Sequence, residues 1–253
     1  MGAVPDEDGT VAAGKQQQSS VRNKLLAALP AEDFLALERH AGSVDLPRGR
    51  VLYEPGEKMQ HAYFPHTAVV SLVAVLEEGR TAEVALFGCE GVLGLAGSFV
   101  SRESFGRYVV QIPGTASRVG IDKLLGVLDT SPAARDLMRR YVDALFTQAF
   151  QTVACNAMHS VEARCCSWIL RTHDRMSQDT LPLTHEFLAE MLGVQRSTVS
   201  LVTHSLQNAG LITQSRGAIT VTDRSGLEDA ACACYGIIRR KFGRLLPNTY
   251  ETP

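Results

Sequence analysis

The chain has 253 residues, of which 27 are acidic and 25 basic, so its formal net charge is −2. This near-neutral balance excludes a broadly basic protein that coats nucleic acid, but it allows positive charge to be concentrated at one site. Hydrophobic residues make up 45% and charged residues 21% of the chain, which is typical of a soluble globular protein with room for two domains.

Nothing in the sequence resembles a membrane span or an export signal. No apolar run approaches the roughly 18 residues that a membrane span needs. Residues 1–20 contain acids and glutamines where a signal peptide would carry basic residues and an apolar core. We therefore expect a cytoplasmic protein that has no membrane partner.

The cysteines are scattered and lie mostly in apolar surroundings. In a reducing compartment such residues are free thiols. We assign them no metal, because Cys165-Cys166 and Cys232-x-Cys234 match no familiar metal-binding spacing. Both pairs are expected on helices, where neighbours one or two positions apart point to different faces. The six cysteines are Cys89, Cys155, Cys165, Cys166, Cys232 and Cys234.

The chain begins with a predicted tail and a pair of helices. Residues 1–20 are polar and lack periodicity, so we expect a disordered tail. Residues 21–41 carry apolar side chains at helical spacing, but Pro30 interrupts them. Because proline breaks a helix interior, we expect two short helices rather than one.

Residues 44–120 change to a strand pattern. Short runs of valines and aromatic residues are separated by turn signals such as Pro55-Gly56 and Pro113-Gly114. The segment 68–76 predicts a strand, and 81–87 predicts the strand that returns beside it. Many short strands separated by turns are typical of an antiparallel β-roll that is jelly-roll-like. Its interior either forms a ligand pocket or is filled by its own core.

A short helix predicted over 121–128 leads into a long one. Ser131 is a good cap and Pro132 suits a first turn, after which residues 133–158 contain neither proline nor glycine. An apolar stripe near a 3.5-residue period follows this helix. We favour pairing of the stripe with a second subunit, and the alternative is packing on the roll of the same chain. The stripe consists of Met138, Val142, Leu145, Ala149 and Val153, widened by Leu137, Tyr141, Phe146 and Phe150.

The segment 183–208 has the pattern of a helix-turn-helix. Thr184 caps a first helix, Gly193 ends it, and a second helix begins at about Arg196. One face of the second helix is apolar and the other is polar, as in helices that enter the major groove of DNA. No aspartate or glutamate occurs between residues 191 and 222, as expected of a surface that meets phosphates. The alternative is an ordinary helical hairpin.

The neighbouring segments complete a winged helix. Residues 161–176 predict a helix before the motif, and 211–213 with 218–222 predict a hairpin that has Arg216 at its tip. Residues 225–246 predict one closing amphipathic helix. The predicted division is a tail at 1–20, a β-roll at 21–131, a helix at 132–158 that we expect to dimerise, and a DNA-binding module at 159–253.

The order of these parts is an α+β arrangement of an antiparallel β-roll, a long helix and a C-terminal winged helix-turn-helix. It resembles the Crp/Fnr superfamily of bacterial transcription regulators. The resemblance covers residues 23–246 and is strongest over 159–235, which contains GVQRSTVSLVTHSLQNAGLI. It implies a homodimer that binds double-stranded DNA at a palindromic operator. It also implies a signal sensed by the roll and RNA polymerase as a further partner.

The roll departs from the family members that bind cyclic nucleotides. Their phosphate cassette has a Gly-Glu pair and, further on, an Arg-Ser-Ala or Arg-Thr-Ala triplet. Here Val92 replaces the glutamate within 91–95, and the second element falls near 105–107 without the triplet. Arg102 and Arg107 are out of register with it. Because a buried cyclic phosphate needs a paired cation, we expect no cyclic-nucleotide binding.

Other cofactors of the family are not expected either. No cysteine precedes Cys89, so the N-terminal cysteine set of the iron–sulfur members is missing. His61 and His66 are candidate axial ligands for haem, an alternative that we do not favour, because a lone histidine near turns is more often exposed. No cofactor is therefore predicted.

The helix pattern and the resemblance together select the residues expected to meet DNA. Arg196 matches the base-reading arginine of the family and can place two donors on guanine. Ser197 and Leu201 stand where the family often has glutamate and a second arginine, so we do not assume its usual half-site. Secondary base contacts are expected from Gln195, Ser197, Ser200 and His204. Phosphate contacts are expected from Thr184, His185, Thr198, Thr203 and Arg216.

Two other classes of function are alternatives to a DNA-binding regulator. A signalling or ligand-binding module whose winged helix mediates protein interaction is the main alternative, and a salt-dependent affinity for DNA would separate the two. An enzyme built on a jelly roll is disfavoured, because the sequence shows neither a His/Glu metal set nor a nucleophile paired with a base. We therefore expect no enzymatic activity.

Overall fold

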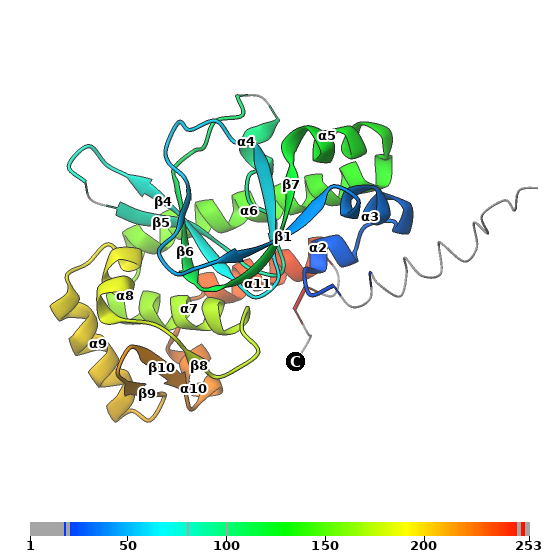
Figure 1. Cartoon of the computed structure of the whole chain (residues 1–253). Helices are drawn as coiled ribbons and strands as arrows, with labels where there is room; N and C mark the ends of the chain where they lie inside the picture. The colour runs from blue at the N-terminus through cyan, green and yellow to red at the C-terminus, as the bar shows by residue number, and fades with distance from the viewer. Residues whose placement is uncertain (1–17, 19–20, 80, 100, 247–248, 251–253) are drawn as a thin grey trace, which may run out of the picture.

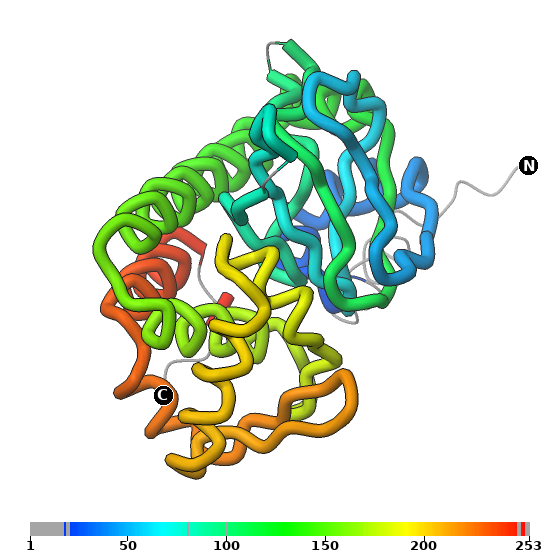
Figure 2. The backbone as a smooth tube through the Cα atoms, turned by 90° about the vertical axis from the view of Figure 1, so that its left-hand side faces the viewer, coloured from blue at the N-terminus to red at the C-terminus, as the bar shows by residue number. Residues whose placement is uncertain are grey.

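The computed structural model of the chain describes residues 18, 21–79, 81–99, 101–246 and 249–250. A β-roll occupies one half, the long helix α6 (Pro132–Met158) runs along it, and the winged helix lies beside the roll (Figures 1 and 2). The predicted α+β architecture is confirmed. Within the described residues, none of the helices combines the length and the apolar character that crossing a membrane requires.

Two short helices precede the roll, as predicted. They are α2 (Lys24–Ala27) and α3 (Ala31–Glu38), and Pro30 stands at the start of α3. The side chain of Asn23 caps α2 by accepting from the Leu26 amide at 3.0 Å. Of the predicted tail only Gln18 lies within the described residues, and it is buried and donates to the carbonyl oxygen of Leu29 at 2.8 Å. The remainder of that prediction lies outside the described residues.

The roll consists of two antiparallel sheets. One has the order β1-β7-β3, and the other has the order β2-β6-β4-β5. The predicted hairpin is β4–β5, and Gly79 turns it with a φ of +77° that favours glycine. A short helix, α4 (Leu95–Ser98), lies between β5 and β6. The strands are β1 (Ala41–Leu46), β2 (Val51–Tyr53), β3 (His61–Pro65), β4 (Val69–Val75), β5 (Thr81–Phe87), β6 (Arg107–Ile112) and β7 (Gly114–Gly120).

Aromatic side chains fill much of the space between the two sheets. The Tyr53 ring meets the rings of Tyr63 and Tyr108 edge to face, with centroids 6.2 and 6.3 Å apart. Phe87 lies 5.6 Å from Tyr108, measured between ring centroids. All four rings are buried, and burial raises the pKa of the Tyr53 hydroxyl to about 12. The roll therefore contains a packed aromatic core.

The long helix has the predicted bounds. Helix α5 (Ile121–Thr130) precedes it, and α6 spans Pro132–Met158. The hydroxyl of Ser131 accepts from the Ala134 amide at 3.2 Å, which satisfies one of the free amides at the start of α6. On the inner face of α6, Tyr141 donates to the carbonyl oxygen of Val92 at 2.9 Å and Gln148 donates to that of Leu86 at 3.1 Å. These bonds fix α6 to the roll.

The C-terminal part contains the predicted winged helix and one extra strand. The short strand β8 completes the order β8-β10-β9. Helices α7 and α8 and the turn before α9 follow the predicted order. The elements are α7 (Val161–His173), β8 (Thr180–Leu181), α8 (His185–Leu192), α9 (Arg196–Asn208), β9 (Ile212–Ser215) and β10 (Ala218–Val221).

The prediction of a single closing helix over 225–246 is wrong. The chain forms α10 (Arg224–Ala230), a break, and then α11 (Cys234–Leu245). At the break the amide of Cys232 donates to the carbonyl oxygen of Ala163 at 3.4 Å, so tertiary contacts override a continuous apolar pattern. Helix α11 then packs along α6, where Lys241 pairs with Asp143 at 2.8 Å. The last helix therefore binds the long helix and lies apart from the wing.

Two buried ion pairs join the roll to α7 and to Arg175, which lies two residues past the C-terminal end of α7. Arg171 donates to Glu83 at 2.7 Å, and Glu83 also accepts from the Trp168 indole at 3.0 Å and from Ser71 at 2.6 Å. Arg175 pairs with Glu90 at 2.6 Å, and both side chains are almost fully buried. Because a buried charge is stable only with its partner, these pairs hold the winged helix against the roll.

Removing one partner of the first pair is expected to destabilise the protein strongly. Glu83→Ala leaves the Arg171 guanidinium buried without its partner, which costs on the order of 3–5 kcal/mol. Urea unfolding followed by circular dichroism measures the loss. Glu54→Ala is the matched control, because it removes an exposed pair with Arg107 that is worth about 0–1 kcal/mol. Equal losses in the two variants would contradict this account.

Candidate nucleic-acid interface

The helix-turn-helix is held by local bonds and by a shared apolar core. Thr184 accepts from the Phe187 amide at 3.3 Å and so caps α8. Gly193 ends α8 in the left-handed conformation, with φ +65°, and α9 begins three residues later. Leu188, Val199 and Leu206 are buried in the same core as Trp168 of α7. This packing fixes the angle at which α9 leaves the module.

The outer face of α9 is exposed. Arg196, Ser197 and His204 are exposed, as is Gln195 immediately before the helix. Leu201, which lies one turn after Ser197, is also 74% exposed. An exposed leucine amid polar residues has no partner in the apolar core of its own module. The face therefore combines hydrogen-bonding groups with one apolar contact point.

Arg196 is held by a carboxylate that the sequence analysis did not anticipate. Its Nε lies 2.8 Å from Glu186 Oε1 in the first turn of α8, and both side chains are about two-thirds exposed. The segment without aspartate or glutamate begins at residue 191, and it includes all of α9. The carboxylate that pairs with Arg196 therefore comes from α8, at a position that precedes that segment. An exposed pair is worth about 0–1 kcal/mol, so Arg196 can exchange this partner at little cost.

His185 links the two helices to the wing. Its Nδ1 lies 3.0 Å from the Ser200 hydroxyl, and its Nε2 lies 2.6 Å from Gln214 Oε1 of β9 and 3.2 Å from the Thr203 hydroxyl. Gln214 was not among the predicted residues, because nothing in the strand pattern marks it. Thr203 is fully buried and also donates to the carbonyl oxygen of Val199. In this arrangement Thr203 supports the interface from within and does not reach its surface.

The wing lies beside the start of α8. Arg216 is exposed in the turn between β9 and β10, and Gly217 completes that turn with a φ of +77°. Thr184 and His185 are half-buried at the edge of a groove, and Thr198 is half-buried on α9. The groove is lined by Leu183, Thr184, His185, Glu186, Arg196, Gln214, Ser215, Gly217, Ala218 and Ile219.

The predicted subunit stripe on α6 divides between two faces. Met138 is fully buried in its own chain, and Leu145 packs against the cores of the roll and the N-terminal helices. Val142 and Ala149 are half-buried, whereas Val153 is 65% exposed. Two aromatic residues share the exposed side: Phe146 and Phe150 are 53% and 72% exposed and stack with ring centroids 6.2 Å apart. The exposed apolar stripe is therefore centred on Phe150.

The two arginines near the cassette region are paired with carboxylates. Arg102 contacts Asp122 at 2.7 Å, and Arg107 contacts Glu54 at 2.9 Å. Val92 and its neighbour Leu93 are buried. The segment 91–95 therefore packs with apolar side chains, and the nearby cations are already compensated.

The two candidate haem histidines lie at the two ends of β3. His66 shares a hydrogen bond of 2.8 Å with the Ser117 hydroxyl. Burial lowers the pKa of both imidazoles, with a further contribution from Arg118 at His61 and from Arg22 at His66. The structure does not bring these two side chains together at one site.

A group of soft metal ligands does come together, although the sequence analysis assigned none. Cys155, His159, Cys232 and Cys234 place one ligand atom each within 4.8 Å of one another. The group could not be recognised in the sequence, because a continuous closing helix would point the last two cysteines apart. The break before α11 turns both thiols toward the end of α6. The remaining pair, Cys165 and Cys166, is buried in α7, and burial raises the pKa of both thiols.

The comparisons with known proteins agree with this arrangement. Residues 163–230 match the family described as a Crp-like helix-turn-helix domain. The global nitrogen regulator of Synechococcus elongatus is 26% identical over 204 residues, which cover 74% of this chain and 92% of that protein. FixK2 from Bradyrhizobium japonicum has a TM-score of 0.66 at 17% identity, covering 76% of this chain and 98% of that one. The c-di-GMP responsive global regulator CLP of Xanthomonas campestris has a TM-score of 0.59 at 16% identity, covering 76% and 99%.

A Crp-like helix-turn-helix domain joined to a β-roll and a long helix defines a class of protein, the helix-turn-helix transcription regulators. Within that class, this chain carries a Crp-like helix-turn-helix domain at residues 163–230 and is similar in fold to regulators of the Crp/Fnr type.

Proposed function

We propose that the protein binds a palindromic DNA operator as a homodimer and responds through its roll to a signal other than a cyclic nucleotide. The observation that carries this proposal is the exposed outer face of α9, with Arg196 at its N-terminal end. The N-terminal residues of a recognition helix are the ones that meet base edges in the major groove. The family match over residues 163–230 supports the same role for α9.

The proposed base contacts follow from the chemistry of that face. Arg196 would leave Glu186 and donate twice to one guanine. Leu201 would contact a thymine methyl group, the apolar feature of the major groove. Gln195, Ser197 and His204 are exposed and are proposed as secondary base contacts. Ser200 is half-buried and bonded to His185, so we propose that it orients that ring and makes at most a peripheral contact.

The proposed phosphate contacts surround the base-reading face. Thr184 and His185 at the start of α8 line the groove. Arg216 at the tip of the wing lies between Ser215 and Gly217, which also line it. Thr198, on α9, is half-buried and is included as a further contact. Such contacts position a module without specifying sequence. Thr203 is no longer proposed as a phosphate contact, because its hydroxyl is buried.

The proposed dimer uses the exposed side of α6. Val142, Phe146, Ala149, Phe150 and Val153 follow the i, i+4 and i+3 spacing that brings side chains onto one helix face. Exposed large apolar side chains in a row mark an interaction surface. Pairing with the same stripe of a second chain would cover them with two-fold symmetry.

Each part of the chain has its own proposed role. The roll at 21–131 would sense, α6 at 132–158 would dimerise, and residues 159–253 would bind DNA, with α11 returning to brace α6. The packed aromatic core and the paired arginines support a signal that is not a cyclic nucleotide. A cytoplasmic location, contact with RNA polymerase and the lack of enzymatic activity complete the proposal.

Arg196→Ala is expected to weaken binding to the preferred duplex by about 1–3 kcal/mol and to relax the preference at one base pair, because the bidentate contact to guanine is lost. Fluorescence anisotropy with the preferred and a scrambled duplex measures both effects. Arg240→Ala is the control, because this exposed arginine lies on α11 away from the recognition face. An equal loss of affinity for the two duplexes would make Arg196 a phosphate contact. If the winged helix binds protein instead, the wild-type chain would show no salt-dependent affinity for DNA.

Phe150→Asp is expected to convert the dimer to monomers. The substitution puts a charge into the centre of the exposed stripe, where a partner would have to desolvate it. Light scattering coupled to gel filtration should show a mass that falls from two chains to one. Phe105→Asp is the matched control, because Phe105 is 64% exposed but lies in the roll. A dimer that survives Phe150→Asp would place the subunit contact elsewhere.

A further inference from the structure

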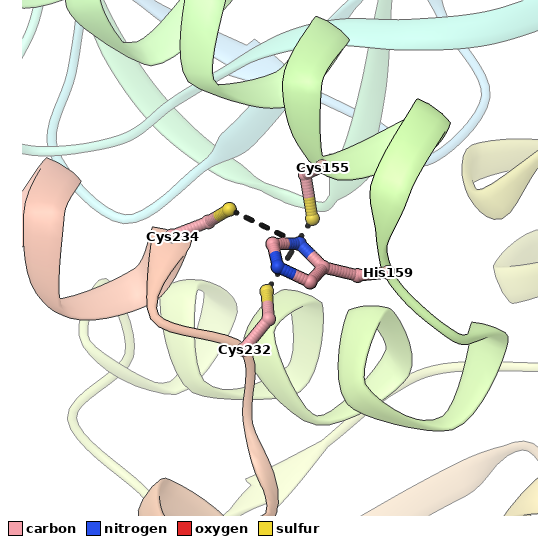
Figure 3. A group of neighbouring side chains, drawn as sticks. All are labelled: Cys155, His159, Cys232 and Cys234. Carbon is pink, nitrogen blue, oxygen red and sulfur yellow. Dashed lines mark hydrogen bonds between the residues drawn. The ribbon is translucent and has the colours of Figure 1, made fainter.

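Three thiols and one imidazole converge where the long helix ends (Figure 3). Cys155 Sγ lies 3.4 Å from Cys232 Sγ, and Cys234 Sγ lies 3.4 Å from His159 Nδ1. All four ligand atoms lie within 4.8 Å of one another. A tetrahedral zinc ion with Zn–S bonds of about 2.3 Å and a Zn–N bond of about 2.0 Å separates its ligand atoms by roughly 3.5–3.8 Å. The observed separations bracket that range.

The backbone places each ligand without strain. The amide of His159 donates to the carbonyl oxygen of Cys155 at 3.1 Å, so these two residues stand one helical turn apart on the same face. Cys232 lies in the break between α10 and α11, and Cys234 is the first residue of α11. The break lets both thiols face the long helix, which a continuous helix would prevent. The ligands therefore come from two rigid helices and a short connection.

The surroundings suit a metal site better than an apolar core. Cys155, Cys232 and Cys234 are 9%, 7% and 2% exposed, yet in the described part of the chain the apolar cluster that they form adds just Ala163. The amide of Gln151 contacts Cys234 Sγ at 3.2 Å, as an outer partner that supports a thiolate ligand does. Thus the sulfur atoms of these cysteines contact one another and polar groups.

An arginine lines the cavity next to two of the cysteines. Arg164 lines the same cavity as Cys155 and Cys234. Its Nε is buried and has no hydrogen-bond partner among the described residues. Three thiolates and one neutral imidazole around a divalent ion leave one net negative charge. One nitrogen of the Arg164 guanidinium already donates to the carbonyl oxygen of Leu192, so this side chain would add positive charge to the cavity without being a ligand.

We infer that these four side chains bind a Zn²⁺ ion in a closed, tetrahedral Cys₃His site. The ion would join the C-terminal end of α6 to the junction of α10 and α11. The backbone amide of Cys232 also donates to the carbonyl oxygen of Ala163 in α7. The site therefore contacts α7 as well as α6, α10 and α11. Zinc would thus lock the orientation of the winged helix relative to α6. This inference does not depend on DNA binding, because it rests on the ligand group alone.

The test measures the metal directly in the full chain. The zinc content of protein purified without chelator is measured by inductively coupled plasma mass spectrometry, and we expect about one zinc ion per chain. Metal-free protein is then titrated with Co²⁺, and we expect thiolate-to-cobalt charge-transfer bands and the visible bands of a tetrahedral ion. Cys155→Ser and Cys232→Ser should each lower the zinc content at least tenfold at a fixed concentration of a competing chelator. Cys89→Ser is the matched control, because this half-buried cysteine lies outside the group, and it should retain the metal.

Two outcomes would overturn the inference. In the first, the wild-type protein contains no zinc and shows no thiolate-to-cobalt charge-transfer bands with Co²⁺. This result does not depend on whether a variant folds. The other is loss of metal in Cys89→Ser equal to that in Cys232→Ser. Thiol titration of the denatured, chelated protein adds a check: six reactive thiols agree with a metal site. Four reactive thiols together with no bound metal would instead show one disulfide, for which the Cys155–Cys232 pair is the first candidate.

Discussion

The buried pairs between α7 and the roll are the contacts on which the rest of the structure depends. Glu83 of β5 binds Arg171, and Glu90 binds Arg175, with almost no exposure to water. Gly88 is required here, since a Cβ at that position would lie 2.7 Å from the Arg175 side chain. Because separating either pair would leave a buried charge unpaired, the roll and the winged helix keep a fixed relation in this structure. A change in β5 or in residues 88–90 would therefore be transmitted to α7.

The position of the recognition helix follows from this docking. The first helix of the motif also contacts the roll, where Gln111 of β6 donates to Met191 of α8 at 3.0 Å. On the opposite side, α11 returns to α6 and the Cys₃His group links the same helices. The proposed reading face of α9 is thus held from the roll, from the long helix and from the wing. Any signal that acts through the roll would alter DNA binding by changing these contacts.

Local sequence features predicted those parts of the fold that local chemistry determines. Ser131 and Pro132 marked the start of α6, and Gly193 marked the turn of the motif, because caps and turns act over a few residues. The break before α11 was missed, because the bond from Cys232 to Ala163 joins residues 69 positions apart (232 − 163). The Glu186 partner of Arg196 and the burial of Thr203 were missed because each depends on how α8 and the wing pack against α9, which the pattern of α9 alone does not show. A periodic pattern identifies the apolar face of a helix but does not identify what packs against it.

The most direct test of the proposed function is selection of bound duplexes from a random DNA pool with purified protein at two salt concentrations. The account predicts enrichment of a palindrome whose half-sites are centred about one helical turn apart, roughly 34–36 Å, with weaker retention at the higher salt concentration. A guanine in each half-site should lose its enrichment in Arg196→Ala. No enrichment at either salt concentration, or an enriched site without two-fold symmetry, would contradict the account of a homodimer that reads DNA through α9.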